Sequence, residues 1–317
     1  MHMSDTLVSP AVAAGAGIVA TTLIIIASRK MKENSRQDIV PLMGVMGAFV
    51  FAAQMINFTI PGTGSSGHLI GGILLSAILG PWCGFITLCS ILLVQCLVFA
   101  DGGLLALGCN IINMAATSCL IAYPLLYKPI AGNSLKPKRI IAGAISASIV
   151  GLLLGAFGVT VETELSGITA LPFSTFLSFM LPIHFVIGGI EGLVTSALLL
   201  FIASNRPAIL TPENIFGENN KDKKKTVFLF FGIVTLVLAS GFSLLASGLP
   251  DGLEWAIERV SSNPELLEAE NPDSVTAIMP DYQSSFSGIL GALIVMVLLW
   301  GLSSFVFSQI KKSVKVK

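Results

Sequence analysis

The chain has 317 residues, of which 54% are hydrophobic and only 11% are charged, and its formal net charge is zero. Soluble globular domains carry about 25% charged residues, so this composition excludes a soluble protein and is typical of a chain that crosses a membrane several times. The balanced charge gives no sign of a nucleic-acid partner.

Nine apolar segments follow one another along the chain. They cover residues 9–28, 41–58, 68–80, 81–99, 105–126, 138–161, 172–204, 226–248 and 286–309. A membrane-spanning helix needs about 20 apolar residues, so the third segment is short, and Gly80-Pro81 predicts a tight turn after it. We expect an all-α fold, a polytopic helical bundle that is an integral, multi-pass protein of a prokaryotic inner membrane.

The basic residues indicate which loops face the cytoplasm. If the N-terminus lies outside, every Lys and Arg except Arg259 falls in a cytoplasmic loop or in the C-terminal tail, as the positive-inside rule requires. No basic residue precedes Arg29, so the start lacks the positive region of a cleaved secretory signal. We therefore expect an uncleaved N-terminus outside the cell and a cytoplasmic C-terminus.

A polar stretch with prolines and a lysine cluster, residues 206–225, predicts a cytoplasmic linker between two units. We expect a membrane bundle over residues 1–205 and a two-helix hairpin over residues 226–317. The hairpin encloses an acidic outer loop, 249–285, which begins PDGLEWAIERV. The apolar spacing from Leu253 to Val260 predicts a short amphipathic helix there.

The three histidines all fall toward the outer side in this topology. The Met1 amine, the backbone nitrogen of His2 and the imidazole of His2 can chelate one metal through a five-membered and a six-membered ring. One further imidazole, from His68 after the glycine-rich INFTIPGTGSSG, would complete a square plane. Such an all-nitrogen site suits Ni²⁺ or Cu²⁺ and tolerates Co²⁺. The alternatives are a mobile terminal His2 and a loop or helix-capping His68.

His184 and Glu191 lie on one face of the segment 172–204, and Glu191 is the only acidic residue deep within an apolar segment. A buried ionisable group in a membrane bundle is a functional candidate. We expect both residues to make structural hydrogen bonds or to contact a partner subunit, with direct metal ligation as the alternative. The stretch HFVIGGIEG is no HExxH motif, so it does not support an intramembrane zinc protease.

Nucleotide and thiolate sites are not supported. The glycine-rich loop 62–67 is followed by His68 and Leu69, where a phosphate loop has Lys and Ser or Thr, and no other such motif is present. ATP hydrolysis would therefore need partner subunits. The five cysteines lie in apolar runs without CxxC spacing. We interpret them as reduced core residues, with a thiolate metal site as the alternative.

Four ordered motifs resemble a known family: MHMSD at the start, QMINFTIPGTGSSGHLIGG, ADGGLLALGCNIINMA and LPIHFVIGGIEGLVTS. Over about residues 1–205 they look like the CbiM/NikM family, the substrate-binding membrane subunits of energy-coupling factor (ECF) transporters for cobalt and nickel. The stretch PDGLEWAIER between two spans is similar to the PDGLE domain of the CbiN/NikN accessory subunit, here fused to the front part.

The resemblance implies a metal site made of the Met1 amine, the backbone and ring nitrogens of His2, and a ring nitrogen of His68. It also implies that Asn57 and Asn110 orient loops through hydrogen bonds. The implied partners are a transmembrane coupling subunit and two cytoplasmic ATPase subunits. Co²⁺ or Ni²⁺ is then the transported substrate; we expect no resident cofactor and no catalytic residue.

Two other classes of protein stay open from the residues alone. A proton-coupled secondary transporter of divalent metal would show inverted repeats and several buried charges, and we find no repeat and essentially one buried acid. A membrane metalloenzyme would need an open coordination position with a general base nearby, and we find no convincing base. We therefore expect a metal-capture subunit of an importer and not an enzyme.

Overall fold

The structure is a computed structural model. It describes residues 1–33, 39–132, 135–205, 207, 210, 221–240, 246–261, 279 and 287–301, without the side chains of 32–33, 205 and 221–228. Most of the predicted linker, most of the acidic loop after residue 261 and the tail after residue 301 lie outside the described residues, together with the predictions made for them.

Long helices form the bundle. They are α1 (Pro10–Glu33), α2 (Val40–Gln54), α4 (Pro81–Phe99), η3 (Ile111–Tyr127), α7 (Pro137–Ser166), α8 (Phe173–Asn205), α10 (Lys221–Ser240) and a last helix, Ser287–Gly301. The short helices are η1 (Asp5–Leu7), α3 (Gly72–Leu79), α5 (Leu107–Asn110), α6 (Lys128–Ala131) and α11 (Gly252–Val260). Because α5, η3 and α6 follow one another without a break, they act as one long helix.

Five helices in the described part of the chain are long and apolar enough to cross a membrane. They are Pro10–Met31, Pro81–Phe99, Leu107–Ala131, Pro137–Ser166 and Phe173–Ser204. The predicted all-α, multi-pass fold is confirmed, although not every apolar segment is a span by its length. The helix α3 has only 8 residues and ends at Leu79, directly before the turn predicted at Gly80-Pro81. Gly80 has a φ of 84°, which glycine adopts readily.

A small antiparallel hairpin connects α2 to α3. Its strands are β1 (Phe58–Ile60) and β2 (Ser65–Gly67). The helix expected within the segment 41–58 therefore ends at Gln54. Proline and glycines in the turn reverse the chain, so that β2 returns toward the bundle. His68 follows β2 directly, and the hairpin thus delivers this histidine to the interior.

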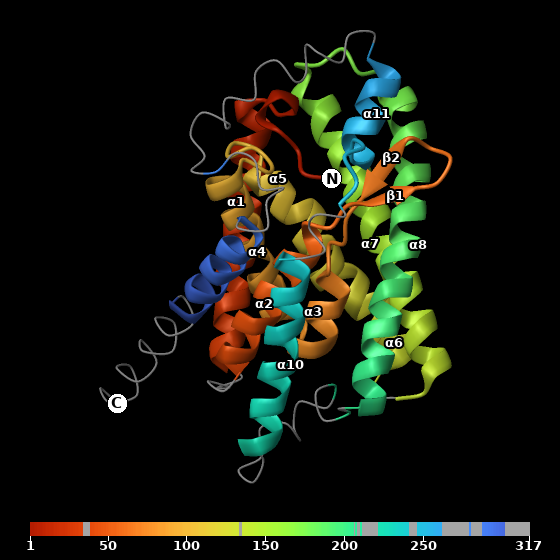
Figure 1. Cartoon of the computed structure of the whole chain (residues 1–317). Helices are drawn as coiled ribbons and strands as arrows, with labels where there is room; N and C mark the ends of the chain where they lie inside the picture. Colours follow the sequence, from red (N-terminus) through yellow and green to blue (C-terminus); the bar gives the residue numbers. More distant parts are fainter. Residues whose placement is uncertain are drawn as a thin grey trace, which may run out of the picture.

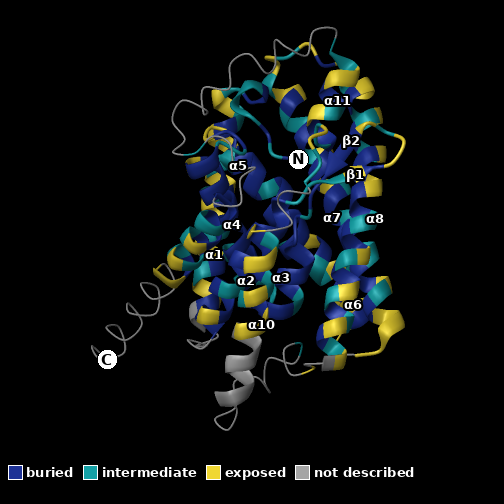
Figure 2. Cartoon of the chain, viewed as in Figure 1, coloured by how far each residue is buried: buried dark blue, intermediate teal, exposed yellow. Residues whose placement is uncertain are grey.

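The N-terminus, the hairpin and α11 gather toward one end of the molecule, whereas α6 and the start of α10 lie at the other (Figure 1). The end with α6 carries Lys128 and Lys136, in agreement with the segregation of charge read from the sequence. Figure 2 shows the N-terminus entering a largely buried region between the helices. The first residue of the chain, Met1, is only 4% exposed.

Candidate metal site

The N-terminal residues enter the bundle and are hydrogen-bonded to α5 and to the loop before it. The Met3 N–H donates to Oδ1 of Asn110 at 2.8 Å, and Nδ2 of Asn110 donates to the Met3 carbonyl at 3.1 Å. The Gly103 N–H donates to the same carbonyl at 2.9 Å. Both the N–H and the carbonyl of Met3 are therefore hydrogen-bonded, which fixes the position of the two residues before it.

A glycine in this loop makes room for the N-terminus. Gly102 has a φ of 86°. A Cβ atom at this position would lie 2.8 Å from Nδ2 of Asn110 and 3.3 Å from Cβ of His2. Another residue would suffer both backbone strain and a steric conflict. The motif ADGGLLALGCN, residues 100–110, thus surrounds the start of the chain, and we call it the cradle.

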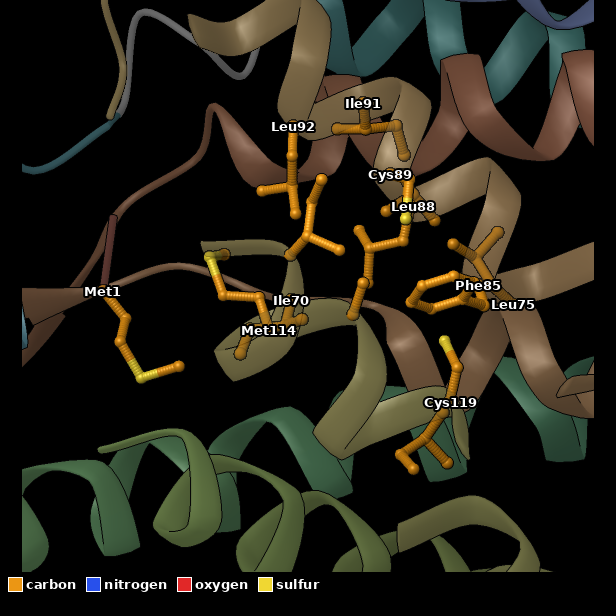
Figure 3. Close-up of a cluster of buried hydrophobic side chains, with 14 of the residues drawn as sticks. Met1, Ile70, Leu75, Phe85, Leu88, Cys89, Ile91, Leu92, Met114 and Cys119 are labelled. Carbon is orange, nitrogen blue, oxygen red and sulfur yellow. The ribbon is translucent and has the colours of Figure 1, made fainter. Parts of the chain in front are cut away.

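Met1 is held by its side chain and by its amine. Figure 3 shows the side chain in a cluster of buried residues that includes Ile70 and Met114. Its Cε atom packs so closely on α7 that a Cβ at Gly155 would come within 2.6 Å of it. The Met1 amine lies 3.4 Å from Nε2 of His68 and forms a close ion pair with Asp251.

The structure brings His2 and His68 together beside this amine. Their rings stack with centroids 5.1 Å apart and an interplanar angle of 20°. Nδ1 of His68 lies 3.1 Å from the Leu69 carbonyl, which can only accept, so Nε2 presents its lone pair to the Met1 amine. Nδ1 of His2 lies 3.1 Å from Oδ1 of Asp101. The predicted ligands Met1, His2 and His68 thus share one buried site.

Burial keeps both imidazoles neutral. It lowers the pKa of His68 to about 3, and the positive N-terminal amine adds to the effect. Burial also lowers the pKa of His2, although the Asp101 carboxylate opposes the shift. A neutral imidazole is the form that binds a metal ion. His68 is therefore ready to act as a ligand across the physiological pH range.

The second unit of the chain contributes a carboxylate that sequence reasoning missed. Oδ2 of Asp251 pairs with the Met1 amine, and Oδ1 accepts from the N–H groups of Leu253 and Glu254 at the start of α11. Burial alone would raise the pKa of Asp251, but the N-terminal ammonium holds it well below its usual range. The Asp251 charge, followed by burial, raises the pKa of Glu254 to about 7.

Residues 247–255, which we call the PDGLE strap, are hydrogen-bonded to the hairpin that carries His68. The Ser66 N–H donates to the Pro250 carbonyl at 2.7 Å. At the other end of the strap, Nε1 of Trp255 donates to the Thr63 carbonyl at 2.9 Å. The strap includes the first turn of α11, and the buried face of this helix includes Leu253, as the amphipathic pattern predicted. The strap therefore covers the site from the side of the second unit.

Two further predicted residues contact the strap. The Asn57 carbonyl accepts from the Ser247 N–H at 2.8 Å, a main-chain contact at the base of the hairpin. His184 has Nδ1 2.8 Å from the Met180 carbonyl, whereas its buried Nε2 has no hydrogen-bond partner. The His184 ring borders a small cavity that is also lined by Met1, His68, Asp251 and Gly252. The His184 ring thus lines the site.

Glu191 holds the loop that follows His68. Its two carboxylate oxygens accept from the N–H groups of Ile70 at 2.9 Å and Gly71 at 3.1 Å. This acid is 1% exposed, and the main-chain donors of the two residues just before α3 satisfy its hydrogen-bonding capacity. It fixes the backbone two residues beyond the His68 ligand.

Within the described residues, no three His, Cys, Asp or Glu side chains gather into a group that could hold a metal ion. This is compatible with a ligand set that draws two of its four nitrogens from the N-terminal main chain. All five cysteines are free thiols, and four of them are buried. They behave as the small core residues that the sequence suggested.

The fold and the site together define a class: a multi-pass membrane protein that presents buried nitrogen donors toward one end of a helical bundle. The chain belongs to the CbiM family. Its residues 2–209 match the family described as the cobalt uptake substrate-specific transmembrane region, and residues 225–308 match the PDGLE domain. The resemblance inferred from the sequence motifs is confirmed.

The chain is similar to proteins named for nickel transport and to one named for cobalt transport. A chain of Archaeoglobus fulgidus that carries the name NikMN is 29% identical, over 96% of this chain and 99% of its own length. A fused nickel transport protein NikMN of Rhodobacter capsulatus is 27% identical, over 83% of this chain and 77% of its own. The cobalt transport protein CbiM of Geobacter sulfurreducens is 25% identical, over 83% and 78%.

A solved structure supports the same assignment. The crystal structure of a truncated transition metal transporter superposes with a TM-score of 0.56 at 28% identity, over 64% of this chain and 99% of that one. The relatives are named as transport proteins and not as enzymes, in agreement with the prediction of a non-enzymatic transporter subunit. A metal ion is then a substrate of this family and not a cofactor.

Proposed function

We propose that this protein is the substrate-capture subunit of an energy-coupling factor transporter that imports Ni²⁺ or Co²⁺. The ion is bound by the Met1 amine, the main-chain and ring nitrogens of His2, and Nε2 of His68. The observation that carries this proposal is the 3.4 Å approach of the Met1 amine to Nε2 of His68 inside the bundle.

The spacing of these nitrogens suits a small ion. Metal–imidazole bonds are about 2.0–2.1 Å long, so neighbouring corners of a square plane lie about 2.8–3.0 Å apart. The Met1 amine and Nε2 of His68 need to approach by only about half an ångström to reach that spacing. The hydrogen bonds between Met3 and Asn110 support the two nitrogens of His2 at the other corners of the plane, because they fix the backbone that carries His2.

Proton exchange balances the charge of the site. A Ni²⁺ ion replaces one proton of the Met1 ammonium and the proton of the His2 peptide nitrogen. The local charge is one positive unit before, from the ammonium, and one positive unit after, from the dication and the deprotonated peptide. Asp251 faces this charge in either state, which reduces the cost of keeping it buried.

The ligand set favours Ni²⁺ over Co²⁺. Four nitrogens in a plane, one of them a deprotonated peptide nitrogen, suit the tetragonal preference of Ni²⁺. Fused relatives that match both units of this chain are named for nickel, which supports the same choice.

Import requires partners in this proposal. The sequence carries no phosphate-binding loop, so two cytoplasmic ATPase subunits and a transmembrane coupling subunit would supply the energy and the movement. The site lies outside and the C-terminus inside, in accord with the distribution of basic residues. A proton-coupled carrier would instead accumulate metal in liposomes under a pH gradient without any ATPase, and we expect no such uptake.

Isothermal titration calorimetry with Ni²⁺ tests the site. We expect His68→Ala to abolish high-affinity binding, because it removes a ligand. The companion variant His184→Gln tests the alternative ligand that lines the same cavity: we expect it to retain binding, and loss of binding would place His184 in the ligand set. Metal-free melting curves of both variants check that the bundle is intact. Unchanged affinity in a folded His68→Ala protein would refute the proposed ligand set.

A further inference from the structure

Two buried atoms near the site lack partners. Nε2 of His2 and Oε1 of Gln95 are both shielded from solvent, and neither makes a hydrogen bond in the metal-free protein. Gln95 is 0% exposed and lies in the last turns of the apolar helix α4. Buried polar atoms are almost always satisfied, so such a pair within one site calls for an explanation.

A chain of hydrogen bonds fixes the orientation of the Gln95 amide. The Ile70 carbonyl can only accept, and Nε2 of Gln54 donates to it at 2.8 Å. Oε1 of Gln54 then accepts from Nε2 of Gln95 at 3.0 Å. The Ile70 N–H donates to Glu191, so this end of the hydrogen-bond network is held in place. As a result Gln95 must present its oxygen, an acceptor, to the remaining side.

The same region holds the other face of His2. The Asp101 N–H donates to the Gln95 carbonyl at 3.0 Å, which ties the two residues together at the end of α4. Oδ1 of Asp101 lies 3.1 Å from Nδ1 of His2, so in the metal-free state the ring carries its proton on Nδ1. The Gln95 side chain lies beside the His2 ring, where, together with the Asp101 carboxylate, it opposes the lowering of the His2 pKa by burial. Asp101 and Gln95 thus bracket the His2 ring.

We propose that Gln54 and Gln95 are positioning residues that hold an acceptor ready for Nε2 of His2, so that Nδ1 is released to bind the metal. This inference rests on the proposed function, in which the six-membered chelate ring requires Nδ1. When the metal enters, the ring proton is lost from Nδ1 and one is carried on Nε2 instead. The ring therefore holds one proton in both states, and Oε1 of Gln95 accepts the Nε2–H.

This arrangement joins the two histidine ligands through one network. Gln54 donates to the Ile70 carbonyl in the loop that follows His68, and Gln95 interacts with the His2 ring. A metal-bound histidine usually donates its other ring N–H to a fixed acceptor, and loss of such a partner typically costs about 10–100-fold in metal affinity. We expect Gln95→Met, which removes the acceptor at similar volume, to weaken Ni²⁺ binding by about tenfold or more.

NMR of the protein with ¹⁵N-labelled imidazoles gives a readout that a merely structural role would not move. Square-planar Ni²⁺ is diamagnetic, so the His2 signals can be followed in the loaded wild-type protein. We expect the proton on Nδ1 without metal, and on Nε2 with Ni²⁺, where it exchanges slowly with solvent. In Gln95→Met the Nε2 proton of the loaded protein should exchange faster. A His2 proton that stays on the same nitrogen in both states would overturn the proposal.

Matched variants separate this inference from the proposed function. Thr87→Val removes a buried hydroxyl of the same helix that bonds only within it, to the Cys83 carbonyl, and should leave Ni²⁺ affinity within about twofold. If His68→Ala binds Ni²⁺ normally, the proposed site itself is wrong. If His68→Ala loses binding while Gln95→Met retains both the affinity and the slow exchange, only the role of the two glutamines is wrong. If Gln95→Met does not fold, the exchange rate of the Nε2 proton in the Ni²⁺-loaded wild-type protein still tests the role of Gln95, because a proton without an acceptor would exchange rapidly and that result would overturn the inference.

Discussion

Two segments reach the same histidine from opposite ends of the chain, and they are held in different ways. The N-terminal residues 1–5 lie in a cradle of buried groups, with the Met3 main chain paired to Asn110 and Gly103. The PDGLE strap, residues 247–255, lies over the hairpin through main-chain and side-chain hydrogen bonds, of which the Thr59–Ser247 bond is exposed and the Trp255–Thr63 bond is partly buried. In the proposed site the first segment supplies ligands, whereas the second supplies only a counter-charge, Asp251.

This difference indicates separate roles for the two segments: the N-terminal segment positions the proposed ligands, and the PDGLE strap covers them. Buried hydrogen bonds position a ligand because leaving them unmade is costly, whereas contacts at a partly exposed surface can open at little cost. The cradle is therefore the part of the molecule that sets metal affinity. The strap is suited to cover or uncover a site whose ligands are already in place.

The largest expected effect is that of pH, because only the N-terminal segment loses protons when the metal binds. Two protons leave for each Ni²⁺, one from the Met1 ammonium and one from the His2 peptide nitrogen, so affinity should rise about a hundredfold per pH unit. His68 adds no third proton, since its pKa is about 3. Calorimetry over a series of pH values measures the slope. A slope of one proton would mean that the His2 peptide nitrogen stays protonated and is no ligand.

The next effect tests the cradle. Asn110→Leu leaves the N–H and carbonyl of Met3 buried without their side-chain partner, and we expect Ni²⁺ affinity to fall by about 10–100-fold. Asn110→Asp keeps the acceptor for the Met3 N–H and should recover part of the loss. Equal affinity of Asn110→Leu and wild type, with intact folding by thermal melting, would show that the cradle does not position the ligands.

The smallest effect concerns the strap. Asp251→Asn removes the carboxylate that pairs with the Met1 amine, and we expect Ni²⁺ affinity to stay within about twofold, because the site carries the same charge before and after the metal binds. Glu258→Gln is the matched control, since Glu258 is an exposed acid on the same helix, α11. A loss in Asp251→Asn larger than that in Asn110→Leu would reverse the comparison and make the strap the main determinant of affinity.

The sequence predicted much of the fold because apolar length and charge segregation are strong signals. The turn at Gly80-Pro81 and the amphipathic helix after Asp251 followed from local chemistry. The hairpin at residues 58–67 was not predicted, since its glycine-rich sequence between two apolar segments also suits an irregular loop. The strand β2 is in addition hydrogen-bonded to the strap, and such long-range contacts leave no local pattern.

The candidate ligands were predictable from the chemistry of an N-terminal histidine, and the motifs around Asn110 pointed to loop orientation. The residues that support the ligands were not. Asp251 looks like a helix cap, because an Asp followed three residues later by a Glu forms a capping box. Gln54 and Gln95 are isolated polar residues in apolar helices, and only their packing against His2 and Ile70 reveals the network.

The central claim is that the first residue of the chain binds the metal through its own amine. The most direct measurement is a Ni²⁺ titration of the protein that begins at Met1 beside a version with one extra residue before Met1, with the N-terminal mass of each verified. We expect high affinity in the first and its loss in the second, because the added peptide bond removes the amine and the cradle has no room for it. Equal affinities would contradict the account.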